Sequence, residues 1–198
     1  MTIHALGYQA ARARLQFLDT VPLDRETAAR GALAGAVAAG VWAAQSPLDT
    51  RVFRWPYLDQ ELLGKLVTRG RGWLPVGVAL HVGNGALFGA GYALVARRLP
   101  GPAWARGPVA GLAEHLATWP LTALVDRHHP ARGELPALAG RPRAVAQAPW
   151  RHVLFGVVLG ELERRLNPPP PAPPPAFAPV LSSNGHGNIE HAAAGSER

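Results

Sequence analysis

Three long stretches of this chain carry almost no charge. Residues 31–48 and 72–96 contain no Asp, Glu, Lys or Arg, and residues 107–125 contain only Glu114. Crossing the core of a bilayer, about 30 Å thick, takes about 20 helical residues. Each stretch is therefore long enough to cross a membrane, and together they predict an all-α, polytopic membrane protein.

An internal repeat relates these stretches to one another. Residues 87–99 and 154–166 both read Leu-Phe-Gly followed, at the same spacing, by Arg-Arg-Leu. Residues 30–35 and 106–111 share the pattern Arg-Gly-x-x-Ala-Gly. The simplest account is a duplicated two-helix hairpin, with both copies in the same orientation about an axis along the membrane normal.

The repeat bears on residues 149–166, which by themselves could form a surface helix with Pro149 at its first position. If the second stretch crosses the membrane, its copy at 149–166 is expected to cross too. The sequence thus predicts four transmembrane helices as two repeated hairpins. The expected spans are about 30–48, 73–96, 105–125 and 149–166.

The composition excludes several classes of protein. Charged residues make up 17% of the 198 residues, against about 25% in an average soluble domain. The absence of cysteine excludes a disulfide scaffold, a zinc–thiolate site and a thiol nucleophile. The net charge of +7 comes from arginines scattered between apolar segments and one lysine, Lys65. No nucleic-acid-binding motif accompanies them, so no nucleic-acid partner is expected.

The connections also suit a membrane protein. Leucines within residues 57–69 share one helical face, which indicates either an interfacial helix lying on the membrane or an amphipathic helix capping the bundle. Aromatic residues flank the spans, as in the aromatic belts of membrane proteins. They are Trp55, Tyr57, Trp73, Trp104 and Trp150.

The two ends of the chain are expected to lie outside the membrane domain, residues 28–166. Residues 1–27 lack the apolar core of a signal peptide and are read as an N-terminal cytoplasmic segment. Residues 167–198 begin with a proline run and are expected to form a disordered tail. With Arg151 counted in the third loop, Lys and Arg number ten on each side of the membrane, but those nearest the spans favour cytoplasmic termini.

Each predicted span carries a small-x-x-x-small pair of glycines, which suits close backbone packing between helices in lipid. The expected helix-packing glycines are Gly31, Gly35, Gly85, Gly89, Gly107, Gly111, Gly156 and Gly160.

Several polar residues fall at membrane depth, where such groups are costly and often functional. They form a candidate intramembrane cluster: His81, Asn84, Glu114, His115 and His152. One interpretation is a proton relay or a transition-metal site, and the other is interhelical hydrogen bonding that holds the bundle. Glu114 and His115 are adjacent and point about 100° apart, so they cannot both face one ligand squarely. No metal-binding signature is present, so neither a metal nor a cofactor is expected.

Other polar and proline positions leave alternatives open. Asp126, His128 and His129 follow the third span and could ligate a metal at the surface or form a solvated loop. Pro47 and Pro120 could each kink or end their helices.

Several of these segments resemble the YagU-like family of bacterial inner-membrane proteins. The resemblance rests on His81 followed by Phe88-Gly89-x-Gly91-Tyr92-Ala93, on residues 107–111 and 119–121, and on the end of the fourth span. It covers roughly residues 28–166 and implies four spans in the bacterial plasma (inner) membrane. The family is largely uncharacterised, and acid tolerance has been associated with it. It transfers no catalytic residue, and His81 is the one polar position carried over. The first loop is shorter here and the Pro-rich tail differs.

These observations lead to two hypotheses of different classes. The first is a non-enzymatic membrane protein with a structural, scaffolding or stress (acid) tolerance role. The alternative is a small transporter or proton- or ion-conducting module that uses Glu114 and the histidines. No nucleophile, phosphate-binding loop or dinucleotide motif supports an enzyme. The expected partners are the lipid bilayer and either a second copy of the chain or another membrane protein.

Overall fold

The computed structural model describes residues 24–169, which form helices joined by turns and contain no strand. The long helices are α2 (Arg25–Phe53), α4 (Trp73–Val95), α5 (Ala103–Thr118) and α7 (Pro142–Leu166). The short ones are α3 (Asp59–Val67), η1 (Ala96–Arg98), η2 (Trp119–Leu121) and α6 (Thr122–His128). The all-α prediction is confirmed over these residues. Most of the expected N-terminal segment and Pro-rich tail, residues 1–23 and 170–198, lies outside the described part.

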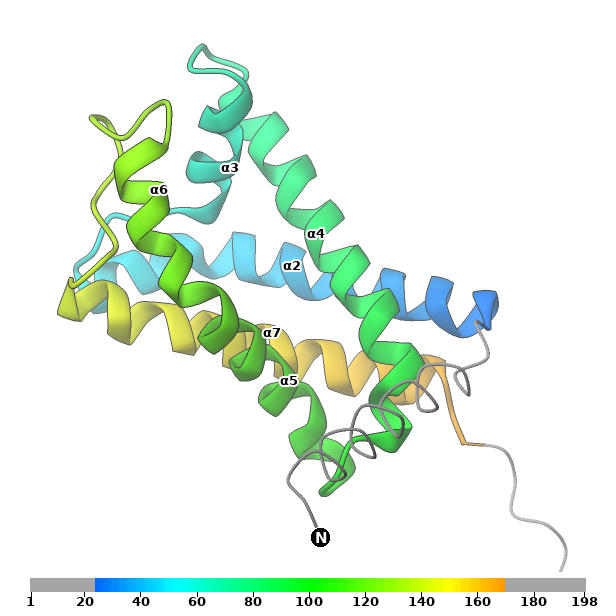
Figure 1. The fold of residues 1–198 in the computed structure, drawn as a ribbon. Helices are drawn as coiled ribbons and strands as arrows, with labels where there is room; N and C mark the ends of the chain where they lie inside the picture. The colour runs from blue at the N-terminus through cyan, green and yellow to red at the C-terminus, as the bar shows by residue number, and fades with distance from the viewer. Residues whose placement is uncertain (1–23, 170–198) are drawn as a thin grey trace, which may run out of the picture. The chain divides into compact units, whose positions relative to one another are not determined.

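The described helices form two crossed pairs. Helix α4 packs across α2, and α5 packs across α7. The pairs join through α2 and α7, which run alongside each other, while α4 and the α5–α6 segment slope across them (Figure 1). Each pair corresponds to one of the hairpins expected from the repeat.

Glycines set the distance between α2 and α4. A Cβ added at Gly35 would collide with the backbone of Gly85, and one added at Gly89 would collide with Gly31. A Cβ at Gly85 would lie 2.5 Å from the Cβ of Ala39. Because no side chain separates the two backbones at this crossing, the helices approach as closely as their main chains allow.

The crossing of α5 and α7 repeats this arrangement. A Cβ at Gly107 would collide with the carbonyl oxygen of Gly156, and Gly160 lies beside the same point. Gly111 faces the backbone of His152. Under the alignment of the repeat, Gly107 meets Gly156 as Gly31 meets Gly89. All eight predicted packing glycines therefore lie at these two crossings.

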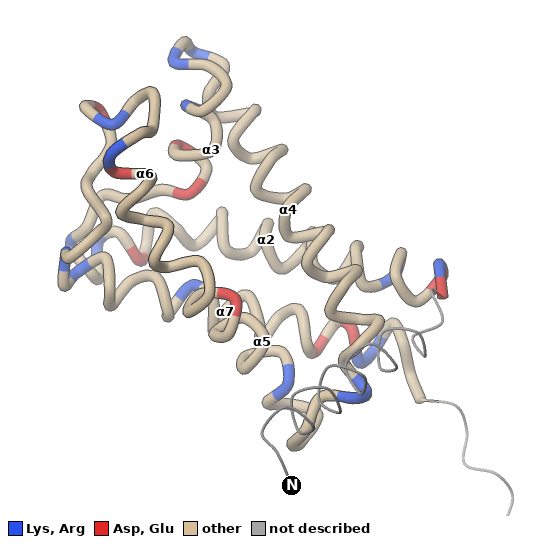
Figure 2. The backbone as a smooth tube through the Cα atoms, in the orientation of Figure 1, with Lys and Arg blue, Asp and Glu red and all other residues tan. Residues whose placement is uncertain are grey.

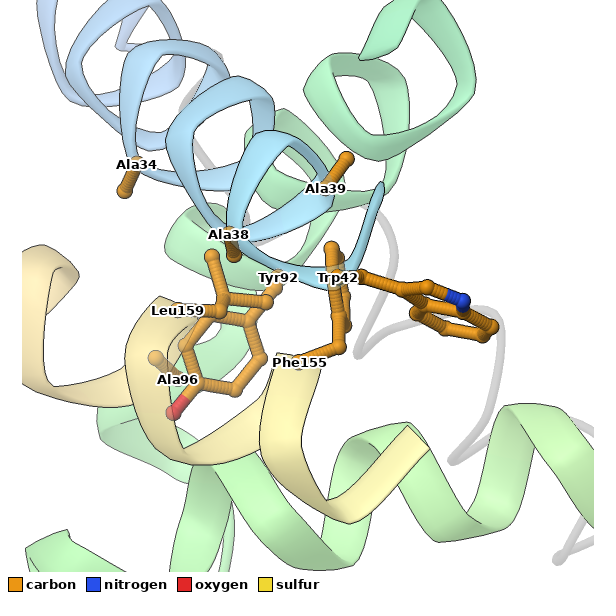
Figure 3. Close-up of a cluster of buried hydrophobic side chains, with 8 residues drawn as sticks. All are labelled: Ala34, Ala38, Ala39, Trp42, Tyr92, Ala96, Phe155 and Leu159. Carbon is orange, nitrogen blue, oxygen red and sulfur yellow. The ribbon is translucent and has the colours of Figure 1, made fainter. Parts of the chain in front are cut away.

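The apolar core is small and rich in alanine. Side chains from α2, α4, η1 and α7 meet in it (Figure 3). Its members are Ala34, Ala38, Ala39, Trp42, Tyr92, Ala96, Phe155 and Leu159. Alanines suit such close helix packing, and the few large rings fill the space where the helices diverge.

Two helix boundaries differ from the sequence prediction. Helix α7 begins at Pro142, so Pro149 lies inside the helix and not at its start. The expected third span is interrupted, because α5 ends at Thr118 and a 3₁₀ turn containing Pro120 leads into α6. Pro120 lacks an N–H and cannot continue the α-helical hydrogen bonding. Pro47, by contrast, lies inside α2, which continues to Phe53.

Helix α3 packs on the start of α4. A Cβ at Gly64 would collide with the carbonyl of Trp73, and one at Gly77 with the carbonyl of Gln60. Lys65 Nζ lies 3.1 Å from Glu134 Oε2, which ties α3 to the turn after α6. Hydrogen bonds from Arg69 and Lys65 hold the pKa of Glu134 below its usual value. This geometry suits a helix that caps the bundle, and its depth in a membrane stays a prediction.

Charged residues gather at the two ends of the helix pairs, and the backbone between the ends is almost free of them (Figure 2). Among the described helices, one segment, Trp73–Arg98, is long and apolar enough to cross a membrane by length and composition. It coincides with the predicted second span. The other three spans fall short of that measure, because α2 is rich in alanine, α5 has 16 residues and α7 carries several charges.

Candidate functional site

A cavity of about 390 Å³ opens among the helices, and all five predicted cluster residues line it. Helix α4 contributes His81 and Asn84, α5 contributes Glu114 and His115, and α7 contributes His152. Residues 62 and 63 of α3 and the η2–α6 segment complete its wall. Although Glu114 and His115 point in different directions, both reach the cavity, because it is wide enough for adjacent positions of one helix to border it.

Glu114 and His152 form the most direct polar contact in the cavity. His152 Nε2 lies 2.8 Å from Glu114 Oε2. The other ring nitrogen, Nδ1, lies 2.8 Å from the carbonyl oxygen of Ala148, one turn earlier in α7. A carbonyl oxygen can only accept, so Nδ1 carries a hydrogen. The Nε2–Oε2 contact then holds one proton, either as carboxylic acid donating to a neutral ring or as imidazolium donating to carboxylate.

A second histidine stands beside this pair. The ring of His115 lies 4.8 Å from that of His152, centroid to centroid, and 5.1 Å from that of Trp119. His115 is buried, with 5% of its surface exposed. The cavity thus has two imidazoles and a carboxyl group on adjoining faces of α5 and α7.

Trp42, a residue of α2, links the two sides of the cavity. Its ring meets His81 edge-on at 5.1 Å and His152 edge-on at 4.8 Å, between centroids. Its indole N–H donates to Asp59 Oδ2 at 2.9 Å. His81 is buried behind it, 7% exposed, and its Nε2 has no hydrogen-bond partner among the described residues. Asn84, on the same face of α4 as His81, is exposed.

An arginine pairs with two carboxylates at one end of the cavity. Arg151 is fully buried, and its Nη2 and Nε lie 2.6 Å and 2.7 Å from the two carboxylate oxygens of Asp49. Its Nη1 lies 2.8 Å from Asp59 Oδ2, and Nη2 also donates to the carbonyl oxygen of Tyr57 at 2.8 Å. Gln147 donates to Asp49 Oδ1 at 2.8 Å. Two carboxylates therefore neutralise the buried guanidinium, and each of its three nitrogens donates a hydrogen bond.

Tyr57 closes this network from the loop between α2 and α3. Its hydroxyl donates to Asp59 Oδ1 at 2.9 Å, and its ring lies under the guanidinium of Arg151 at 5.3 Å. Burial, reinforced by the negative charge of Asp59, raises the pKa of this hydroxyl well above its ordinary value. The hydroxyl accordingly remains a donor that holds Asp59 in place.

Sequence reasoning missed this arginine network. It counted Arg151 as a loop charge and placed Tyr57 in an aromatic belt, and it did not consider Trp42. The available signal was the position of Asp49 at the end of one apolar stretch and Arg151 at the start of another, since opposite charges at similar depth tend to pair. The sequence does not show which carboxylate pairs with Arg151, because the partners are about a hundred residues apart.

The polar residues after the third predicted span hold a loop together. Asp126 accepts hydrogen bonds from the backbone N–H groups of Leu138 and Ala139 at 2.8–3.0 Å. His129 is buried, and its ring hydrogen-bonds to the carbonyl of Leu62 at 3.0 Å. Within residues 24–169, no group of three or more His, Asp and Glu side chains is placed to hold a metal ion.

Comparison with known proteins adds no relative to this picture. No protein family, curated protein or solved structure matches the chain.

Proposed function

We propose that this chain is a multi-pass protein of the bacterial plasma (inner) membrane, with α2, α4, the α5–α6 segment and α7 as its four membrane helices. Its distribution of side chains supports this proposal, since charged groups such as Arg151 and Asp49 are buried while leucines and valines are exposed. Exposed residues of this kind lie on every long helix: Leu33, Val37, Leu87, Leu112, Leu116 and Val157. A surface of this kind is costly in water and suits hydrocarbon.

Helix lengths are compatible with four spans. Helix α2 has 29 residues and α7 has 25, which at 1.5 Å per residue makes them about 43 Å and 37 Å long. Both exceed the hydrocarbon thickness of about 30 Å, so they can cross even when tilted. The charges at the two ends of the helix pairs would then lie at the two membrane faces (Figure 2). The bacterial setting rests on the resemblance to the YagU-like family.

Within this membrane domain we propose that the cavity binds and passes protons. The observation that carries this proposal is the Glu114–His152 contact, in which two titratable groups share one proton within the wall of a cavity. An unpaired carboxylate at such depth is costly, and pairing with an imidazole lowers that cost. His115 and His81 provide further proton acceptors bordering the same space. A small rearrangement of either helix would move the proton between carriers.

Proton flux in liposomes tests the proposal. Purified protein is reconstituted, a pH gradient is imposed, and the internal pH is followed with a trapped dye. The wild type is expected to dissipate the gradient faster than empty liposomes, and Glu114→Gln to lose this flux, because glutamine keeps the shape of glutamate but cannot carry a proton.

The matched control is Glu161→Gln, which makes the same change at an exposed position of α7 that is paired with Arg164 and Arg165. It should conduct as the wild type does. Equal flux in the wild type and Glu114→Gln, or no flux in a wild type that elutes as a single folded species, would refute the proton role.

A structural role is the second candidate. Tight glycine crossings and the fully paired Arg151 network favour it, because both make the bundle rigid. A rigid membrane protein suits scaffolding or the acid-tolerance role that the resemblance implies. In that case the Glu114–His152 contact joins α5 to α7, and Glu114→Gln would preserve any phenotype, since the amide can still hydrogen-bond.

Both termini are proposed to face the cytoplasm. The cationic residues closest to the helix ends support this orientation. They are Arg30, Arg97, Arg98, Arg106, Arg164 and Arg165. Arg151, which contributed to the tie in the sequence count, is neutralised inside the bundle by Asp49 and Asp59. Removing it leaves the opposite side with one basic residue fewer.

A further inference from the structure

We infer that the cavity takes a monovalent organic ammonium ion that carries an aromatic or bulky apolar body. This inference rests on the proposed function, because both take the cavity to be a binding site. It adds the chemical class of the substrate. Two independent features of the cavity support it: the charge of its wall and its aromatic lining.

The charges around the cavity favour a cation. Glu114, Asp59 and Arg151 line it, and Asp49 lies directly behind Arg151. Glu114 and His152 hold one proton between them and are together neutral. Asp49, Asp59 and Arg151 then leave a net charge of −1, wherever that proton lies. Arg151 is no anion-binding group here, because two carboxylates and the carbonyl of Tyr57 already accept from its three nitrogens. A negative ligand would meet the carboxylates of Glu114 and Asp59 with no described Lys or Arg side chain in the cavity wall, other than Arg151, to compensate its charge.

The lining suits an apolar body next to the positive charge. Five aromatic side chains border the cavity: Trp42, Tyr57, Phe88, Trp119 and Phe155. Aromatic faces attract cations, most strongly where water is excluded. Tyr57 already stacks under Arg151, so this wall holds one cation on a ring in the absence of any ligand. A volume of about 390 Å³ falls within the range of small-molecule sites and accommodates a bicyclic ring with a short chain.

A series of three matched ligands tests this inference on the full-length protein in detergent at neutral pH. The probes are 2-(1-naphthyl)ethylammonium, the neutral 2-(1-naphthyl)ethanol and the anionic 1-naphthylacetate, with binding measured by equilibrium dialysis and naphthalene fluorescence. The ammonium is expected to bind at least about tenfold more tightly than the alcohol, and the acetate more weakly than both. Equal affinities, or a preference for the acetate, would overturn the inference, and this comparison needs no variant to fold.

Two variants locate the bound ammonium. Glu114→Gln should weaken ammonium binding by at least about tenfold and leave alcohol binding unchanged, while Glu161→Gln should change neither. Ammonium selectivity that survives Glu114→Gln in a folded protein would place the ligand elsewhere and refute the site. The binding and flux measurements test the two proposals separately. Proton flux without ammonium selectivity refutes this inference alone, and selective binding without flux refutes only the proton role.

Discussion

At the scale of single residues, the buried charges depend on one another. Asp49 accepts hydrogen bonds from two nitrogens of Arg151, and Asp59 accepts one from the third. Asp59 in turn accepts from Trp42 and Tyr57. Removing Arg151 would leave two buried carboxylates without compensation, and removing one carboxylate would break hydrogen bonds to the guanidinium that the other cannot replace.

Asp49→Asn should therefore destabilise the protein. Asparagine keeps the shape of aspartate, but it turns one of the two acceptors of Arg151 into a donor and removes a negative charge, while Asp59 still neutralises the guanidinium. We expect a loss of about 1–3 kcal/mol in the free energy of unfolding, measured by denaturant titration in micelles and followed by circular dichroism. Arg51→Gln, an exposed position in the same helix turn, should change it by no more than about 0.5 kcal/mol. Equal stability of the two variants would mean that the network contributes little.

At the scale of helices, the two pairs are organised by backbone contact and not by interlocking large side chains. Each crossing places glycine against glycine, at positions that correspond under the internal repeat. The two crossings differ at one aligned position: Gly35 faces Gly85 in the first, and Gly111 faces the backbone of His152 in the second. The second hairpin thus carries a titratable side chain where the first has none. The duplication itself stays a prediction.

Alanine substitutions within α4 separate packing from helix propensity. Gly85→Ala places a methyl group against Ala39 and the backbone of α2, and should destabilise the protein by about 1–3 kcal/mol. A Cβ at Gly83, two residues earlier, meets nothing within 4 Å. Gly83→Ala should therefore be neutral or stabilise by up to about 1 kcal/mol, the propensity gain alone. Thermal unfolding of both variants measures the difference, and the close crossing would be excluded if Gly85→Ala were as stable as Gly83→Ala.

At the scale of the whole described unit, the distribution of polar and apolar residues differs from that of a water-soluble bundle. The interior contains a guanidinium, carboxylates and imidazoles, and much of the exposed helix surface is leucine and valine. The remaining charges lie mostly at the helix ends and in the loops that join them (Figure 2). This arrangement predicts that lipid covers the helices and that alternate loops lie on opposite membrane faces.

Labelling of introduced cysteines tests that arrangement, because the chain has no cysteine of its own. Arg71→Cys and Arg132→Cys place thiols at exposed positions of the first and third loops, and Pro100→Cys places one in the second. A membrane-impermeant maleimide added to intact cells should label the first two and leave the third unlabelled until the cells are lysed. Labelling of all three in intact cells, or release of the protein by alkaline carbonate, would contradict four spans. Labelling of Pro100→Cys alone would invert the orientation.

The sequence alone was sufficient to predict an all-helical chain, the glycines where backbones approach closely and the polar residues within the apolar stretches. Each of these depends on local composition or periodicity. An uncharged run of about 20 residues has the length and composition of a membrane helix, and a glycine pair marks a contact face whatever its partner. The same reasoning located His81, Glu114 and His152 as unusual residues, since a polar side chain within an apolar run is visible without knowledge of its neighbours.

Only the tertiary structure decided which residues meet. The crossing of the helices brings Asp49 and Asp59 to Arg151 and brings Glu114 within hydrogen-bond distance of His152. It also leaves a cavity among aromatic rings that are far apart in the chain. These contacts depend on the register and angle of the two glycine crossings. Register and angle are set by how whole helix surfaces fit together, and no local pattern of residues encodes that fit.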